Sequence, residues 1–372
     1  YCEPKEQQSI LGNIYAARVE RVAEGIHGAF LEIGDNQKCY YSLSAEQPVK
    51  LSPGHEDKLY GGDIILVQIT KDAVKTKLPV GTGNISLDGK YFVFTLTDKR
   101  TGISKKIRNT VERERLETLL KKYTRDEYGI IVRTNAAGVS EETLTKELEL
   151  LQLRYEELMR KAKIAAGKTL LYREPPHYIT LGKELPAKAL DEILTDHAEV
   201  FTELKEYYKQ TSESDTKISF YEDTYSLYNL YRFAHYYEEA YGKYIWLKSG
   251  ASLVIEHTEA MTVIDVNTGS VLKKKKQEDT LFYQINREAA KEIARQLRLR
   301  NISGIIMIDF INMKDTAQKE KLLSLLDSEC KKDRVHCNVI DMTALNLVEM
   351  TRSKVRKPLH EQIRSCMKNN RS

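Results

Sequence analysis

The chain has 372 residues, with 58 Lys and Arg against 54 Asp and Glu and a net charge of +4. A chain of this length is expected to fold into about two to four domains rather than around one core. The charge balance is too mild to indicate nucleic-acid binding by itself. No apolar run approaches the ~18 residues that span a bilayer, and no signal peptide is visible, although the first residue is Tyr1.

The cysteine content indicates a reducing compartment. The count is odd and no two cysteines have Cys-x-x-Cys spacing, so we expect free thiols and a cytoplasmic location. The five are Cys2, Cys39, Cys330, Cys337 and Cys366.

Residues 10–95 have the pattern of a small β-barrel. Strand-like runs at residues 14–22, 29–33 and 64–69 are separated by glycine or charged turns. A five-stranded OB-type barrel is the economical fold for this spacing. Such barrels bind single strands by stacking bases on aromatic side chains beside basic residues.

A basic stretch follows the barrel. Residues 98–125 hold ten Lys or Arg against four Asp or Glu, which is an excess of +6. Charge runs usually form solvated faces. Here Lys105 and Lys106 follow the loop at residues 102–104, and we interpret them as a track for phosphates.

The next predicted strand, residues 129–134, ends in Arg133 and Thr134. A guanidinium fork and a hydroxyl can clasp a phosphate, although Arg is common at strand ends. Ser140 then has the features of a helix N-cap, and an apolar stripe predicts a helix to about Ala165.

Residues 169–248 are the least informative. Pro175 and Pro176 predict a linker, and an apolar stripe predicts a helix; it comprises Leu190, Leu194, Phe201 and Leu204. Eight tyrosines crowd residues 221–244 beside Arg232 and Lys243. They could stack on bases, but such spacing more often packs helix faces, and no site is assigned to them.

Residues 252–313 have the pattern strand, helix, strand. The two strands are predicted at residues 261–267 and 305–310, and residues 281–297 are apolar at every fourth position. This order predicts a parallel pair with a right-handed crossover, whose carboxyl ends share one edge of the sheet.

Asp265 and Asp309 each fall late in one of these strands, and Asn267 is predicted to face the same side as Asp265. Two neighbouring carboxylates repel each other unless a cation or a shared proton intervenes, and hard oxygen ligands suit Mg²⁺ or Mn²⁺. The lysines at 273–276 suit a polyanionic substrate. Alternatively, each Asp alone is only a turn former.

These segments resemble the ribonuclease E/G family. The resemblance is dense over residues 250–356 and thinner but collinear from about residue 10. The matching segments are Ile255–Ala260, Val263–Gly269, Glu288–Arg300, Gly304–Ile311 and Leu347–Arg352. In the family, the residues matching Asp265 and Asp309 bind the catalytic magnesium, and the residue matching Asn267 hydrogen-bonds within that site.

The resemblance also implies RNA-binding residues. The family holds the 5′-terminal monophosphate of RNA with the residues that match Gly89, Val93, Arg133 and Thr134. The loop at residues 135–138 departs from the more Gly-rich loop of the family.

In the barrel, the resemblance makes Phe30 and Tyr40 base-stacking residues and Lys77 a phosphate contact. The family has Phe where this chain has Tyr40. From the residues alone, Phe30 could instead fill the barrel core. The phosphate track of Lys105 and Lys106 follows a loop that also matches the family.

The implied architecture is α+β and multidomain. It comprises an S1 (OB-fold) domain at 10–95, a 5′-end-sensing region at 96–168, an RNase H-like structural subdomain at 169–248, a DNase I-like catalytic subdomain at 249–358 and a tail at 359–372. Many family members share a zinc through a Cys-Pro-x-Cys link, but only Cys366 remains here, so structural zinc is not expected. A homodimer or homotetramer without that link stays open.

We therefore expect a Mg²⁺-dependent endoribonuclease that cleaves single-stranded, preferably A/U-rich RNA, leaves a 5′-phosphate and senses a 5′-monophosphate. Its expected setting is ribosomal RNA processing and messenger RNA decay. The alternative is a catalytically retired member that binds or tethers RNA. A phosphatase of small molecules is disfavoured by the barrel and the basic track.

Overall fold

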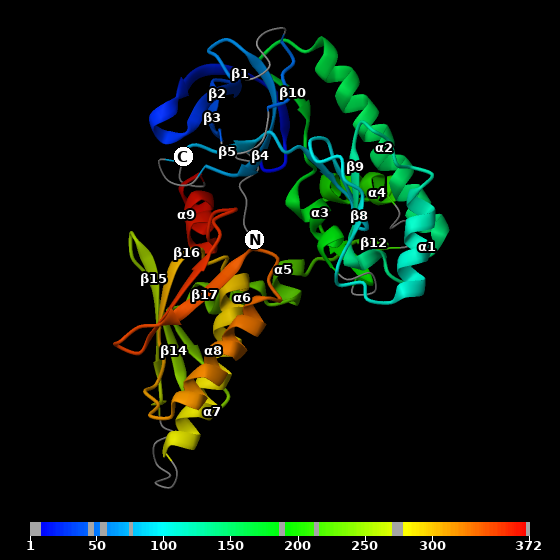
Figure 1. The fold of residues 1–372 in the computed structure, drawn as a ribbon. Helices are drawn as coiled ribbons and strands as arrows, with labels where there is room; N and C mark the ends of the chain where they lie inside the picture. Colours follow the sequence, from blue (N-terminus) through cyan, green and yellow to red (C-terminus); the bar gives the residue numbers. More distant parts are fainter. Residues whose placement is uncertain are drawn as a thin grey trace. The chain divides into compact units, whose positions relative to one another are not determined.

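A computed structural model describes residues 9–43, 48–52, 58–73, 77–185, 190–211, 216–269 and 278–369 (Figure 1). The described chain forms two compact units, residues 9–227 and residues 228–369. Each unit is described by itself. The lysines at 273–276 lie outside the described residues. None of the helices described combines the length and the apolar character that crossing a membrane requires.

The first unit begins with a closed five-stranded barrel, as predicted. Strands pair in the order β1-β2-β3-β5-β4, and β4 returns to pair with β1. The strands are β1 (Ile14–Ala23), β2 (Gly28–Gly34), β3 (Gln37–Ser42), β4 (Ile64–Lys71) and β5 (Val80–Thr82), with a 3₁₀ turn at Glu24–Ile26. Alternate residues such as Ala29, Leu31 and Ile33 are buried inside the barrel. Strand β10 (Thr169–Tyr172) extends the sheet beside β1.

A four-stranded sheet and two helices follow. The strand order is β6-β7-β9-β8, with β6 (Ser86–Asp88), β7 (Phe92–Thr95), β8 (Gly102–Ile103) and β9 (Gly129–Val132). Helices α1 (Thr110–Leu120) and α2 (Glu141–Ile164) share one apolar core with this sheet and with Ile14 and Leu66 of the barrel. The Ser140 hydroxyl accepts from the Thr143 amide at 3.3 Å, which confirms the predicted start of α2.

The unit ends in a small α/β segment in which one prediction is wrong. Leu194 lies in strand β11 (Glu192–Thr195), which pairs in parallel with β12 (Lys217–Phe220), and helix α4 starts only at Ala198. Helices α3 (His177–Glu184) and α4 (Ala198–Gln210) pack by means of Leu204 and Tyr208. The prediction failed because apolar residues of a short strand and of the following helix happen to have the spacing of a single helical stripe.

The second unit is a six-stranded sheet with helices. The strand order is β13-β14-β15-β16-β18-β17, and only β15 and β16 are parallel. The strands are β13 (Tyr244–Trp246), β14 (Ser252–His257), β15 (Met261–Asn267), β16 (Gly304–Asp309), β17 (Cys337–Met342) and β18 (Leu347–Arg352). The parallel pair and its helical crossover are as predicted.

Helices α7 (Glu278–Leu299) and α8 (Thr316–Cys330) lie side by side against this sheet (Figure 1). Buried residues on alternate positions of β15 and β16, such as Ile264 and Ile308, belong to the core that these helices cover. We call the opposite side of the sheet the open face. The unit also has α5 (Leu227–Leu230, which begins at its border), α6 (Phe233–Tyr241) and α9 (Leu359–Asn369).

The crowded tyrosines lie mostly on the surface rather than in helix packing, which corrects the expectation for them. Seven of the eight are exposed: Tyr225, Tyr228, Tyr231, Tyr236, Tyr237, Tyr241 and Tyr244. Several contact other rings, such as Tyr228 and Tyr237 at 6.5 Å between ring centroids.

Candidate active site and RNA-contacting surfaces

Asp265 and Asp309 lie directly opposite each other on the neighbouring parallel strands β15 and β16. Their neighbours Ile264 and Ile308 are fully buried in the helix-covered core. Because successive side chains of a strand alternate between faces, both carboxylates project from the open face. We call Asp265 and Asp309 the acid pair.

Asn267 completes the cluster that the sequence predicted. It follows Asp265 by two residues on the same face, and its side-chain amide donates to Asp265 Oδ2 at 2.8 Å. This contact fixes one carboxylate oxygen of Asp265 and leaves the other available. Asn267 can therefore orient Asp265 without neutralising its charge.

The electrostatics of the acid pair favour a cation. Burial, and then the negative charge of Asp265, raise the pKa of Asp309 above its ordinary value. Among the described residues, neither carboxylate has a basic ion-pair partner, and nowhere do three or more His, Cys, Asp or Glu side chains gather as a ready metal cluster. Two carboxylates with free oxygens on one open face fit Mg²⁺ or Mn²⁺, which keep several waters as ligands.

A residue not predicted from the sequence positions the acid pair. Asn286 of α7 is fully buried, and its side chain bonds both backbone groups of Ile311. The amide donates to the carbonyl at 2.8 Å, and Oδ1 accepts from the N–H at 3.0 Å. Because Ile311 follows Asp309 by two residues, this contact fixes the end of β16. The only sign of Asn286 in the sequence was that it is a polar residue next to Ile285, a member of the apolar stripe of α7.

Arg133 and Asp88 form an ion pair at the predicted phosphate clasp. Arg133 Nη2 lies 3.2 Å from Asp88 Oδ2, and the Arg133 backbone N–H donates to the Tyr91 carbonyl at 2.8 Å. Strand β9 thus ends beside the β6–β7 turn, where Gly89 lies. Val93 pairs with Asp88 on one side and Ile131 on the other. The structure therefore brings Gly89, Val93 and Arg133 together.

Glu147 of α2 shapes the turn at Gly89. Its buried carboxylate accepts from the amides of Tyr91 and Phe92 at 2.7 and 3.0 Å. A Cβ atom at position 89 would lie 2.2 Å from Glu147 Oε1, so this close approach requires glycine.

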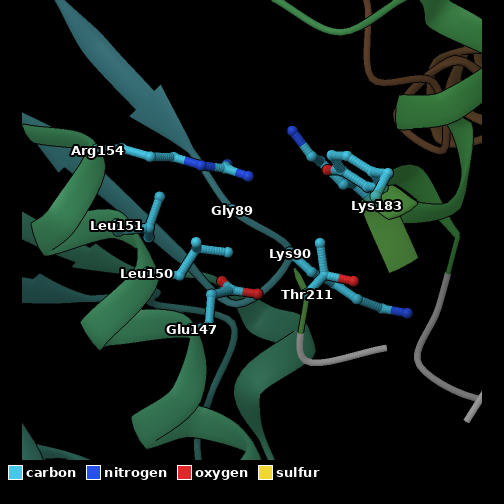
Figure 2. Close-up of a pocket in the computed structure, with 9 residues that line it drawn as sticks. Gly89, Lys90, Glu147, Leu150, Leu151, Arg154, Lys183 and Thr211 are labelled. Carbon is cyan, nitrogen blue, oxygen red and sulfur yellow. The ribbon is translucent and has the colours of Figure 1, made fainter. Parts of the chain in front are cut away.

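A small pocket borders the same turn (Figure 2). Arg154 projects from α2, and Lys183 lies across the pocket on α3. The Lys183 ammonium donates to the Asp88 carbonyl at 3.2 Å and lies 3.3 Å from Glu174. Lys183, which was not predicted as a site residue, therefore ties α3 to the strand that carries Asp88.

Thr134 faces the predicted phosphate track. Its hydroxyl lies 2.9 Å from that of Ser104, directly before Lys105 and Lys106. Both lysines are exposed. The Thr134 hydroxyl is thus anchored to the residue that directly precedes the two lysines.

The barrel presents its predicted aromatic pair on the outside. Phe30 and Tyr40 are cross-strand neighbours with ring centroids 6.2 Å apart, and the Arg21 guanidinium lies 4.5 Å from the Phe30 ring centroid. Both rings are partly exposed, whereas Tyr41 is buried in the barrel core. Phe30 therefore does not fill that core.

Lys77 is exposed and lies two residues before Pro79, which bonds Tyr40 through the backbone. The Tyr40 amide donates to the Pro79 carbonyl at 2.8 Å, and Tyr40 pairs with Val80 of β5. Lys77 thus lies a few residues before β5, the strand that pairs with Tyr40 of the aromatic pair. Such a combination of stacking rings and a cation is typical of single-strand binding.

Comparisons with known proteins identify a matching family and several relatives. The model of the ribonuclease E/G family matches residues 86–355, which include the acid pair and Arg133 but not the barrel. Ribonuclease G of Escherichia coli strain K12 is 33% identical, over 96% of this chain and 76% of that protein. Ribonuclease G of Haemophilus influenzae is 32% identical, over 96% and 75%. Ribonuclease E of Nostoc sp. is 32% identical, over 94% of this chain and 52% of that protein.

Proposed function

Because this chain belongs to the ribonuclease E/G family, we propose that it is a Mg²⁺-dependent endoribonuclease acting on single-stranded RNA. The observation that carries the proposal is the acid pair, opposite in register on two parallel strands and free of a basic partner among the described residues. Mn²⁺ would fit the same oxygen ligands. The relatives named ribonuclease G and ribonuclease E support this class of reaction.

The residues of the chain have separable roles in this proposal. Asp265 and Asp309 would hold the cation, which supplies positive charge to the phosphate being cleaved and assists attack by water. Asn267 holds Asp265 in place through its 2.8 Å hydrogen bond. Cleavage would leave a 5′-phosphate and a 3′-hydroxyl.

The other surfaces would hold the strand. Phe30 and Tyr40 offer faces on which bases can stack, and Lys77, Lys105 and Lys106 offer charge to the phosphates. We propose A/U-rich substrates, because weakly paired segments are the ones that remain single-stranded. RNA processing and decay are the corresponding roles.

The 5′ end of the RNA would be read at the turn beside β9. Arg133 and Thr134 supply a guanidinium and a hydroxyl to a terminal phosphate, while Gly89 and Val93 shape the turn at the other side of the clasp. A terminal monophosphate carries more charge than an internal phosphodiester, so such a clasp can select it.

Cleavage of an A/U-rich oligoribonucleotide by Asp309→Asn tests the proposal. The variant removes one charged ligand, and losing several kcal/mol of transition-state stabilisation lowers kcat by about a hundredfold or more. RNA affinity should stay within about twofold, because the stacking and basic residues of the barrel belong to the other compact unit and are unchanged in this variant. Glu320→Gln, an exposed site on α8, is the matched control. Near-normal cleavage by Asp309→Asn refutes the assignment, and RNA binding without Mg²⁺-dependent cleavage by the unmodified protein indicates a retired nuclease.

A further inference from the structure

Two exposed aromatic side chains stand on the edge strand of the sheet that carries the acid pair. They are Tyr244 and Trp246 of β13, and 60% and 73% of their surfaces are exposed. Ile245 between them is buried in the helix-covered core, so both rings project from the open face. Trp246 is the single tryptophan of the chain. Large exposed aromatics on one face are typical of a binding surface.

The strand register aligns these rings with the acid pair. Tyr244 lies opposite Val254, and Val254 lies opposite the first member of the acid pair. Trp246 lies opposite Ser252, and Ser252 lies opposite Asn267. Directly opposite residues share a face, so each aromatic ring heads a row that ends at the predicted catalytic cluster.

The spacing along each row fits one nucleotide. Two inter-strand steps separate β13 from β15, which is roughly 10 Å. A nucleotide whose phosphate lies at the acid pair can reach that far through its sugar to its base. Within the sheet, the half-buried Val254 is the residue between Tyr244 and Asp265 in the first row, and the small Ser252 is the residue between Trp246 and Asn267 in the second.

The charges around the rings also suit a nucleotide. The Lys243 ammonium lies 5.8 Å from the Tyr244 ring centroid and pairs with Glu256. The face also carries the acid pair, Glu256 and Glu349, so a purely apolar protein partner would have to bury several carboxylates at high cost. A base that stacks on the rings, with its phosphate at a bound cation, avoids that cost.

We propose that Tyr244 and Trp246 form a stacking platform for the base next to the phosphate cleaved at the acid pair. The platform is a determinant of substrate binding in addition to the barrel. It rests on the proposed function, because the acid pair defines where the reacting phosphate lies.

The single tryptophan gives a direct test. The unmodified protein is titrated in Mg²⁺ with a single-stranded A/U-rich oligoribonucleotide that carries non-cleavable linkages, while the anisotropy of a label on the RNA reports binding independently. Stacking should quench Trp246 emission with the same midpoint as the anisotropy. An abasic oligomer of equal length should bind through its phosphates without quenching. Saturated binding without quenching overturns the proposal, as does equal quenching by the abasic oligomer.

Steady-state cleavage with Mg²⁺ provides a second readout. Trp246→Ala should raise KM about fivefold or more, with kcat little changed, because the variant loses the stacking of an RNA base on the Trp246 ring. Trp246→Phe retains an aromatic face and should keep KM close to normal. Tyr236→Ala is the control, because this ring on α6 is also exposed (58%) but belongs to neither row. An unchanged KM in Trp246→Ala overturns the proposal.

The two hypotheses fail in distinguishable ways. Quenching by RNA without Mg²⁺-dependent cleavage supports the platform and refutes the proposed reaction. Cleavage that is lost in Asp309→Asn, together with unquenched Trp246, supports the reaction and refutes the platform. If the fluorescence emission of Trp246 changed with protein concentration in the absence of RNA, the rings would belong to a contact between copies of the chain, and the proposal would be overturned.

Discussion

The guanidinium of Arg133 and the carboxylate of Asp88 form a 3.2 Å ion pair at the end of β9, at the place proposed to receive the 5′ phosphate. Both side chains are partly exposed, at 36% and 51%. A terminal phosphate must therefore compete with Asp88 for the same guanidinium. If the proposed sensing is correct, Asp88 would set a threshold that a weakly charged 5′ end does not overcome.

Arg133→Gln should remove the preference for 5′-monophosphorylated RNA and leave cleavage of 5′-hydroxyl RNA almost unchanged. Asp88→Asn should increase the preference by up to about fivefold, since an exposed ion pair contributes about 0 to 1 kcal/mol. The measurement is a cleavage time course of the unmodified protein and of each variant, on RNA with a 5′-monophosphate and on the same RNA with a 5′-hydroxyl. Asp88→Asn in the Arg133→Gln background is the control and should have no effect. Equal slowing of both RNAs by Arg133→Gln would make Arg133 a general RNA contact.

Salt dependence separates the charged and the stacking contacts of the barrel. Lys77→Ala should reduce the slope of log affinity against log salt by about one, because one phosphate contact is lost. Phe30→Ala should weaken binding by about fivefold or more and leave the slope unchanged, because stacking releases no counterion. Fluorescence anisotropy over a salt series measures both. An unchanged slope in Lys77→Ala would exclude it from the phosphate contacts.

The acid pair could be predicted because its signals are local. Glycine-bounded β-branched strands and a regular helical stripe place Asp265 and Asp309 at matching positions of a parallel pair. The same local logic was wrong at Leu194, where apolar residues of a strand and of the next helix mimicked one stripe. Elements this short have too few residues to distinguish the apolar period of a strand from that of a helix.

Other features depend on register and on helix docking between distant segments. Lys183 reaches Asp88 across 95 residues of chain, and Asn286 reaches Ile311 across 25. The row from Tyr244 to Asp265 exists only because two hairpin registers agree. A residue pattern in one segment contains no information about such alignments, so these positions emerged only from the structure.

The stacked imidazoles of His257 and His360 predict sensitivity to acid. Their ring centroids are 4.2 Å apart, and His257 Nδ1 lies 3.0 Å from the Thr262 hydroxyl. Burial, then the positive charges of His360, Arg300 and Arg364, lower the pKa of His257 to about 4. The unfolded chain therefore binds this proton more tightly than the folded one. The stabilising contribution is present above the ordinary pKa of about 6.5 and is lost as the pH falls toward 4.

Thermal unfolding measures this effect. On going from about pH 7 to pH 5, the Tm of the unmodified protein should fall by about 1 to 3 °C more than that of His257→Gln, a small difference because the ring is partly exposed. The exposed His336→Gln is the matched control and should behave like the unmodified protein. Identical pH profiles for His257→Gln and the unmodified protein would show that the stacked pair does not couple stability to pH.

Asn286 should affect both stability and catalysis. Replacing it with Leu leaves the N–H and the carbonyl of Ile311 without their partners in the core, at a cost of about 2 to 4 kcal/mol. The Tm should fall by about 5 to 10 °C. Because Ile311 follows Asp309 by two residues, kcat at a temperature where the variant is folded should also fall, whereas KM for RNA should not. Gln284→Ala, an exposed site on the same helix, controls for changes in α7 itself. A destabilised variant with full kcat would show that the end of β16 keeps Asp309 in place without Asn286.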